Sequence, residues 1–453
     1  SYAVPNTLAW NNWYHVTAIY DAAASTVKVL LNGQQIYENT SAISTALSSF
    51  SDPFVLGRNP NTGAPRYFNG ALDEVRVFTK ALDLETVRQM MHQEIEVDGF
   101  AVKGSVIDRQ IDNVLWNDLI AYYNFNRLQG DVLFNAATSS NHGKMFNIKS
   151  ILPQSAPLPY VTGANGNLAS TSTLARTDVW NAADLFDSPH AILRVSHDIT
   201  VNNSLGLTGL FVDLSRTMTV LDGAAISNDY YVRLNGTIDL LGDAQLVQTT
   251  RSELDAASTG NLLRRQEGKS DVYSYNYWGS PVGIRNGTTN NNSFRLNMLK
   301  DQYGNIQFTG NSNPPATTPS TISTRWLYSF NNGVTYGDWR AVNPVSTNIA
   351  AGTGWSQKGA GTLQTSYIFD GKPNNGTINI VAVDTDGNPA VNDTESLLAN
   401  PYPSAIDART FIDDNIGIID GVIYIWDQFR GTNHQLAYYE GGYATVTKMA
   451  TVK

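Results

Sequence analysis

The stretch WYHVTAIYDAAASTVKVLLNGQQIYE, residues 13–38, decides the fold class at the start of this chain. Apolar and polar residues alternate along 13–21 and again along 26–38, as they do in β-strands that bury one face. The Asn32–Gly33 pair tolerates the positive φ angles that a tight hairpin turn requires. The stretch therefore predicts antiparallel strands joined by short turns.

The next segment continues the strand pattern and then changes period. PFVLGR (53–58) and NGALDEVRVFTK (69–80) are two further expected strands. In KALDLETVRQMMHQEI (80–95) the apolar residues recur at helical spacing, with Asp83 as the expected N-cap. The residues on that helical face are Leu84, Val87, Met90 and Met91. One short helix after many strands is expected.

The order of these elements resembles a known family. The phrases W-x-HV, YD, LNG, F-LGR and G-x-LDEVRVF follow one another over residues 8–92 as in the second half of a laminin-G-like, concanavalin-type jelly roll. The resemblance implies a jelly-roll domain at 1–98, represented by its C-terminal part, with the family's first half expected before Ser1. A strand that is apolar on both faces needs cover on both sides. We therefore expect residues 119–150 to cover the opening strand, or one of its faces to stay exposed.

Residues 99–168 form the second expected region. LIAYYNFNRLQGDVLFNAATSSNHGKMFNI, from Leu119, resembles the beginning of such a jelly roll, but the continuation is absent. The prolines of ILPQSAPLPYVTG instead predict an extended linker.

Residues 169–250 contain a short internal repeat. MTVLDGAAI, from Met218, aligns with IDLLGDAQL, from Ile238, and ITVNNSLGL, from Ile199, is an earlier copy. Alternating apolar residues with a Gly or Asp corner at this period predict stacked β-solenoid rungs. Plain antiparallel hairpins are the alternative.

The aromatic-rich segment 251–453 predicts another β-sandwich module, truncated at its C-terminal end. A short helix is expected in PSAIDARTFIDDN, with Ser404 as its N-cap. YNYWGSPVG, GKPNNGTI, NPYPSAIDA and YYEGGYA resemble a module of large secreted Bacteroidota surface proteins, which implies export by the type IX secretion system. The fold class expected overall is all-β and multi-domain, with jelly-roll or sandwich modules, a β-solenoid-like segment and few short helices.

Composition narrows the range of partners. The formal net charge of −10, with no basic cluster, argues against nucleic acid. The absence of cysteine excludes disulfides and thiolate metal sites. No run of 18 apolar residues is present, so no transmembrane helix is expected. The expected location is the secreted medium or the outer cell surface.

Catalytic motifs are missing from the sequence. A glycan hydrolase needs two facing carboxylates, whereas the adjacent Asp73 and Glu74 point to opposite faces of a strand. Calcium suits an acidic, loop-rich β-protein, and the resemblance places Asp73 near a structural calcium of some relatives. Four aromatic residues beside Gly, Asn or Pro turns are candidates for stacking on sugar rings. They are Trp339, Trp355, Tyr402 and Trp426.

These observations predict a non-enzymatic, adhesin-like protein fragment that contacts glycans or other surface ligands. Two alternatives stay open. The chain could be the accessory binding region of a glycan-active enzyme whose catalytic domain lies outside it. It could also be a structural spacer, in which case the four aromatic candidates should all be buried.

Overall fold

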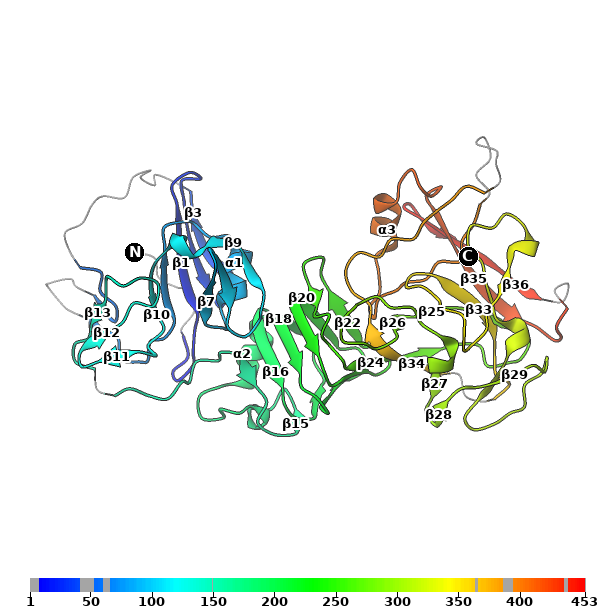
Figure 1. Ribbon diagram of the computed structural model, residues 1–453, viewed down its shortest axis with the longest axis horizontal. Coiled ribbons are helices and arrows are strands. Elements are labelled where there is room, and N and C mark those ends of the chain that lie inside the picture. Colours follow the sequence, from blue (N-terminus) through cyan, green and yellow to red (C-terminus); the bar gives the residue numbers. More distant parts are fainter. Residues whose placement is uncertain are drawn as a thin grey trace. The chain divides into compact units, whose positions relative to one another are not determined.

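The computed structural model describes residues 8–40, 53–59, 66–148, 150–362, 366–385, 394–435 and 439–452. It is mostly β, with three α-helices among these residues (Figure 1). The chain divides into two compact units. Unit 1 comprises residues 1–164, 170–194 and 206–209, and unit 2 comprises residues 165–169, 195–205 and 210–453.

Unit 1 is built from small antiparallel sheets around one helix. Its elements are β1 (Val16–Asp21), β2 (Thr26–Leu31), β3 (Gln34–Asn39), β4 (Arg58–Asn59), β5 (Arg66–Tyr67), β6 (Val75–Phe78), α1 (Leu84–Met90), β7 (Ile95–Asp98), β8 (Ala101–Gly104), β9 (Gln110–Leu115), β10 (Leu119–Tyr123), β11 (Leu128–Gln129), β12 (Val132–Leu133), β13 (Gly143–Lys144), β14 (Tyr160–Val161) and α2 (Ala182–Asp187). β16 (Ala191–Val195) and β18 (Leu205–Val212) belong partly to each unit.

The opening hairpin and helix form as their residues predict. β1, β2 and β3 pair in sequence order, and Asn32 and Gly33 turn the chain with φ angles of 49° and 73°. Asp83 caps α1, because its side chain accepts a hydrogen bond from the Thr86 N–H at 2.7 Å. Both predictions are confirmed.

Residues 119–150 supply part of the expected cover for the opening strand, through β10. β10 pairs antiparallel with β6, and Leu119 and Tyr122 share one buried core with Ile19 and Leu30. The participation of residues 119–123 is therefore confirmed. The opposite face of β1 stays open, since Val16 is 64% exposed.

A buried ion pair lies at the start of β6. Glu74 and Arg76 form it with side chains 9% and 7% exposed, and the Tyr122 hydroxyl donates to Glu74 Oε2 at 2.8 Å. The Arg76 guanidinium also donates to the carbonyls of Met90 and Gln93, at 2.7 and 2.6 Å. These bonds join β6 to β10 and to the end of α1.

Unit 2 begins with parallel rungs. Its elements are β15 (Gly166–Asn167), β17 (Ile199–Val201), β19 (Thr217–Val220), β20 (Ala225–Leu234), β21 (Thr237–Leu240), β22 (Gln245–Gln248), β23 (Glu253–Leu254), β24 (Asn261–Glu267), β25 (Tyr275–Gly279), β26 (Val282–Gly283), β27 (Lys300–Asp301), β28 (Gly304–Asn305), β29 (Gln307–Thr309), β30 (Thr321–Ser323), β31 (Tyr328–Ser329), β32 (Arg340–Ala341), β33 (Gly354–Lys358), β34 (Ser366–Pro373), α3 (Ala408–Asp414), β35 (Val422–Arg430), β36 (Glu440–Thr447) and β37 (Thr451–Val452).

The repeat forms a β-solenoid of about four turns over residues 191–264. In its parallel ladder Ile199 pairs with Met218, Met218 with Ile238, and Ile238 with Leu262. The solenoid prediction is confirmed and the hairpin alternative is wrong, because antiparallel hairpins would not place equivalent residues side by side in parallel register.

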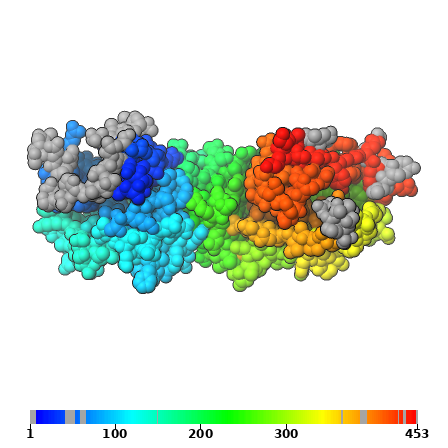
Figure 2. All heavy atoms as spheres, turned by 90° about the horizontal axis from the view of Figure 1, so that it is seen from above, coloured from blue at the N-terminus to red at the C-terminus, as the bar shows by residue number. Residues whose placement is uncertain are grey.

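Beyond the solenoid the strands become antiparallel. β24 pairs with β34, and β25 pairs with β33 at the edge of a four-stranded sheet. The β35–β36 hairpin, in red, lies on the surface of unit 2 (Figure 2). The helix expected near Ser404 begins later than predicted: α3 starts at Ala408, and the Asp407 side chain caps it by accepting from the Thr410 N–H at 2.8 Å. A carboxylate is also favourable at the positive end of the helix dipole.

Candidate functional site

Half-buried aromatic rings from three parts of unit 2 meet at the edge strand β25. Tyr277 of β25 lies between Trp339 and Trp426, with ring centroids 6.1 and 6.3 Å away. Trp426 in turn contacts Tyr443 at 5.1 Å, and Trp339 contacts Phe330 at 5.0 Å. We call Tyr277, Trp339, Trp426 and Tyr443 the aromatic cluster.

Strand register explains why these rings face one another. Trp426 of β35 is the direct antiparallel partner of Tyr443 of β36, so both side chains emerge on the same face of the hairpin. Gln428, two residues further along the same face, attaches that hairpin to β25. Its side-chain oxygen accepts from the Tyr275 N–H at 2.8 Å, which supplies a partner for the free edge of β25.

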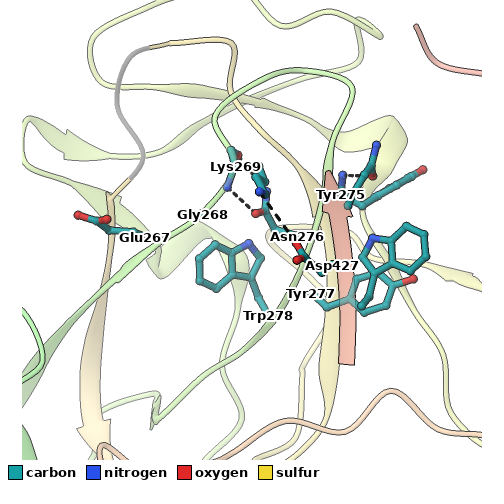
Figure 3. A pocket seen from close by; sticks show the side chains of 10 residues that line it. Glu267, Gly268, Lys269, Tyr275, Asn276, Tyr277, Trp278 and Asp427 are labelled. Atoms are coloured by element: carbon teal, nitrogen blue, oxygen red, sulfur yellow. Dashed lines mark hydrogen bonds and ion pairs between the residues drawn. The ribbon is translucent and has the colours of Figure 1, made fainter. Parts of the chain in front are cut away.

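A cavity of about 440 Å³ adjoins the cluster (Figure 3). It is lined by the loop after β24, by β25 and by β35. The lining residues are Glu267, Gly268, Lys269, Tyr275, Asn276, Tyr277, Trp278, Trp426, Asp427 and Gln428. Aromatic walls with a few polar groups are the usual make-up of small-ligand sites.

The loop that forms one wall is held in place. Asn276 bonds both backbone groups of Lys269: its side-chain oxygen accepts from the N–H at 2.7 Å and its amide donates to the carbonyl at 3.0 Å. Gly268 lies against the Trp278 indole so closely that a Cβ would come within 2.6 Å of the ring. The wall is therefore pre-organised, and only glycine fits there without a shift.

The charges of the pocket are carried by three side chains. The Lys269 ammonium and the Asp427 carboxylate are 4.0 Å apart, with 49% and 32% of their side chains exposed (Figure 3). Glu267 is exposed at the end of β24. Such an open ion pair contributes little stability.

Next to the pocket, Lys358 is enclosed by aromatic rings. Its side chain is 1% exposed, and its Nζ lies 4.1 to 4.9 Å from the ring centroids of Trp326, Tyr275 and Tyr439. It contacts His434 Nδ1 at 3.1 Å and donates to the Tyr439 hydroxyl. Burial lowers the pKa of Lys358 to about 8, although the nearby charge of Asp271 favours the ammonium.

The structure places the four aromatic candidates for sugar stacking in different surroundings. Trp339 and Trp426 come together in the aromatic cluster. Trp355 is 0% exposed and stacks on Phe294 at 5.9 Å, so its ring has no face to offer a sugar and the prediction of a stacking role is wrong for it. Its cross-strand partner is Trp278, and both rings pack against the fully buried Phe369. Tyr402 lies outside the pocket lining, and its hydroxyl donates to the Gly376 carbonyl at 2.8 Å.

Asp73, the predicted calcium ligand, lies in unit 1 and is partly buried. Its Oδ1 accepts from the Glu74 N–H at 3.0 Å, and burial with the nearby charge of Glu94 raises its pKa. The described residues contain no group of three or more His, Cys, Asp or Glu side chains that could hold a metal ion. A calcium site would therefore need carbonyl or water oxygens in addition, and it stays a prediction.

Sequence reasoning missed the residues of β25. Tyr275, Tyr277 and Trp278 lie in DVYSYNYWG, whose alternating aromatics indicate a strand with rings on both faces. That signal was present, but it does not distinguish a pocket wall from a core strand. Lys269 and Asn276 carry no local motif at all.

Comparison with known families gives two matches. Residues 1–88 match the model described as the concanavalin A-like lectin/glucanases superfamily (Laminin_G_3), which confirms the jelly-roll resemblance. Residues 191–452 match the model described as a domain of unknown function (DUF8693). Searches of the curated proteins and of the solved structures found no match. None of the described helices is long and apolar enough to cross a membrane. Since the second model covers more than half of the chain, the chain belongs to the DUF8693 family.

Proposed function

We propose that this chain is a non-enzymatic, carbohydrate-binding protein of the cell surface or the secreted medium, and that the aromatic cluster with its pocket is the binding site. The observation that carries the proposal is that Trp426 and Tyr277 line the same pocket as Lys269, Asn276 and Asp427. Aromatic rings bind the apolar faces of pyranose rings, while amide and charged groups bind their hydroxyls.

The match of the first 88 residues to a lectin and glucanase superfamily supports the same ligand class. A fold match alone does not assign a function, so the proposal rests on the site in unit 2. An adhesin-like role, export by the type IX secretion system and a Bacteroidota source are further parts of the proposal, and they rest on the resemblance of the C-terminal module.

Glycan binding is tested with the purified chain on a glycan array, followed by calorimetric titration of the glycans that bind. W426A and Y277A should each weaken binding by about tenfold or more, because each removes a ring of the cluster. Y303A is the matched control: this tyrosine is 60% exposed in the β27–β28 turn of the same unit and does not line the pocket.

Two results would contradict the proposal. If W426A, Y277A and Y303A bind glycan equally well, the aromatic cluster is not the binding site. If no glycan on the array binds, the ligand is not a carbohydrate. The non-enzymatic part is tested separately by incubating the chain with each bound glycan. Release of new reducing ends that depends on a single carboxylate would contradict it.

A further inference from the structure

The pocket beside the aromatic cluster has a charge balance that selects among sugars. We propose that it binds an uncharged sugar residue through its hydroxyl groups and discriminates against sugars that carry a carboxylate. This inference rests on the proposed function and adds the chemical class of the ligand.

The ionic groups of the pocket are unequal in number. Two carboxylates, Glu267 and Asp427, line it against one ammonium, that of Lys269. The ammonium already lies 4.0 Å from Asp427. An anionic sugar that paired with Lys269 would therefore bring its own carboxylate close to that of Asp427, and like charges at such a distance repel.

The same groups suit a neutral sugar. A carboxylate accepts hydrogen bonds from adjacent hydroxyl groups, and an ammonium donates to hydroxyl oxygens. Uncharged hydroxyls meet both needs without adding a charge to the site.

The walls of the pocket are fixed before any ligand arrives. The Asn276 side chain holds the loop through hydrogen bonds to the backbone of Lys269. The Gln428 side chain joins β35 to β25 by accepting a hydrogen bond from the Tyr275 N–H. Asp427 directly precedes Gln428 in β35, so the backbone that carries its carboxylate is anchored beside the pocket.

The test uses the full chain and two probes: a glucose oligosaccharide, and the same oligosaccharide ending in glucuronic acid, in which a carboxylate replaces the C6 hydroxymethyl group. Calorimetric titration at low and at physiological salt gives the affinities. We expect the neutral probe to bind and the uronic acid probe to bind at least about tenfold more weakly.

Substitutions at the pocket separate charge from shape. D427N removes the repelling charge, so it should bring the two affinities closer together, mostly by strengthening uronic acid binding. K269M should weaken both probes while keeping their order. Y303A should leave all affinities unchanged, and near-ultraviolet circular dichroism checks that each variant stays folded.

The outcomes separate this inference from the proposed function. Binding of the uronic acid probe as tightly as or more tightly than the neutral probe, or an unchanged ratio in D427N, would overturn the inference and leave glycan binding intact. Failure of both probes to bind, together with an empty glycan array, would overturn both the inference and the proposed function.

Discussion

The indole of Trp426 lies nearly parallel to the phenol ring of Tyr277, with centroids 6.3 Å apart and planes inclined by 26°. The two residues come from the edge strand β25 and the β35–β36 hairpin, and their contact brings the hairpin against the pocket. The geometry of this pair decides whether the cluster presents rings to a ligand.

Trp355 should act as a core residue without a binding role. It is 0% exposed and packs against Phe294 and Phe369. W355A should lower the free energy of unfolding by about 3–5 kcal/mol, because it deletes a fully buried aromatic side chain. Urea denaturation measures this, with Y303A as an exposed control that should change little. A W355A chain of unaltered stability would contradict the core assignment.

The ion pair of Glu74 and Arg76 should be costly to break. Both side chains are less than a tenth exposed. R76M leaves the Glu74 carboxylate buried without its cation and should destabilise unit 1 by about 3 kcal/mol. K28M removes one partner of the more exposed Lys28–Glu38 pair and should cost no more than about 1 kcal/mol.

A double variant tests the reason for that cost. E74Q/R76M removes both charges, so it should recover part of the stability lost in R76M. Denaturation of the four chains, wild type included, measures the effect. If the double variant is less stable than R76M, the buried, unpaired charge of Glu74 is not the cause of the stability lost in R76M.

The aromatic enclosure of Lys358 should make stability depend on alkaline pH. Its pKa is lowered from 10.5 to about 8 by burial. Between these two pH values the unfolded chain keeps a proton that the folded chain has lost, so the free energy of unfolding rises with pH across the window. K358M should remove the part of the rise in unfolding free energy that comes from Lys358, as measured by urea denaturation between pH 8 and 10.5. An unchanged slope in K358M would assign the pH dependence to other groups.

His92 should make unit 1 sensitive to acid. Its ring is 8% exposed, its Nδ1 lies 2.9 Å from the Pro157 carbonyl oxygen, and burial lowers its pKa from 6.5 to about 4. As pH falls from 6.5 to 4 the unfolded chain takes up a proton before the folded chain does, so stability is lost in that interval. H92Q should reduce this loss in acid denaturation curves, whereas Y303A should keep it.

Calcium binding at Asp73 predicts a response to metal removal. If Asp73 and Glu94 share a calcium ion with backbone or water oxygens, chelation should lower the melting temperature of the wild type and leave D73N unchanged. Differential scanning calorimetry with and without added calcium measures this. Identical melting of both chains in both conditions would exclude a structural calcium there.

The sequence predicted the turns, helix caps and repeats that depend on interactions between residues close together in the chain. The Asn32–Gly33 turn, the Asp83 cap and the rungs that begin at Ile199, Met218 and Ile238 follow from turn chemistry, capping and a repeating apolar period. Capping also explains the error at α3. Both Ser404 and Asp407 are good cap residues. The helix begins directly after Asp407, the one closer in sequence to its buried residue Ile412.

Only the tertiary structure decided which aromatic residues can meet a ligand. Trp355 and Trp426 both lie in strands with glycines close by on either side, yet the first is in the core and the second at a pocket. The difference arises because β33 is enclosed, with Trp355 opposite Trp278, whereas β35 lies beside the free edge of β25. Strand order and register depend on contacts between distant segments, which a local pattern of residues does not encode. The sequence by itself determined the strands, turns and repeat, and long-range strand pairing determined the site.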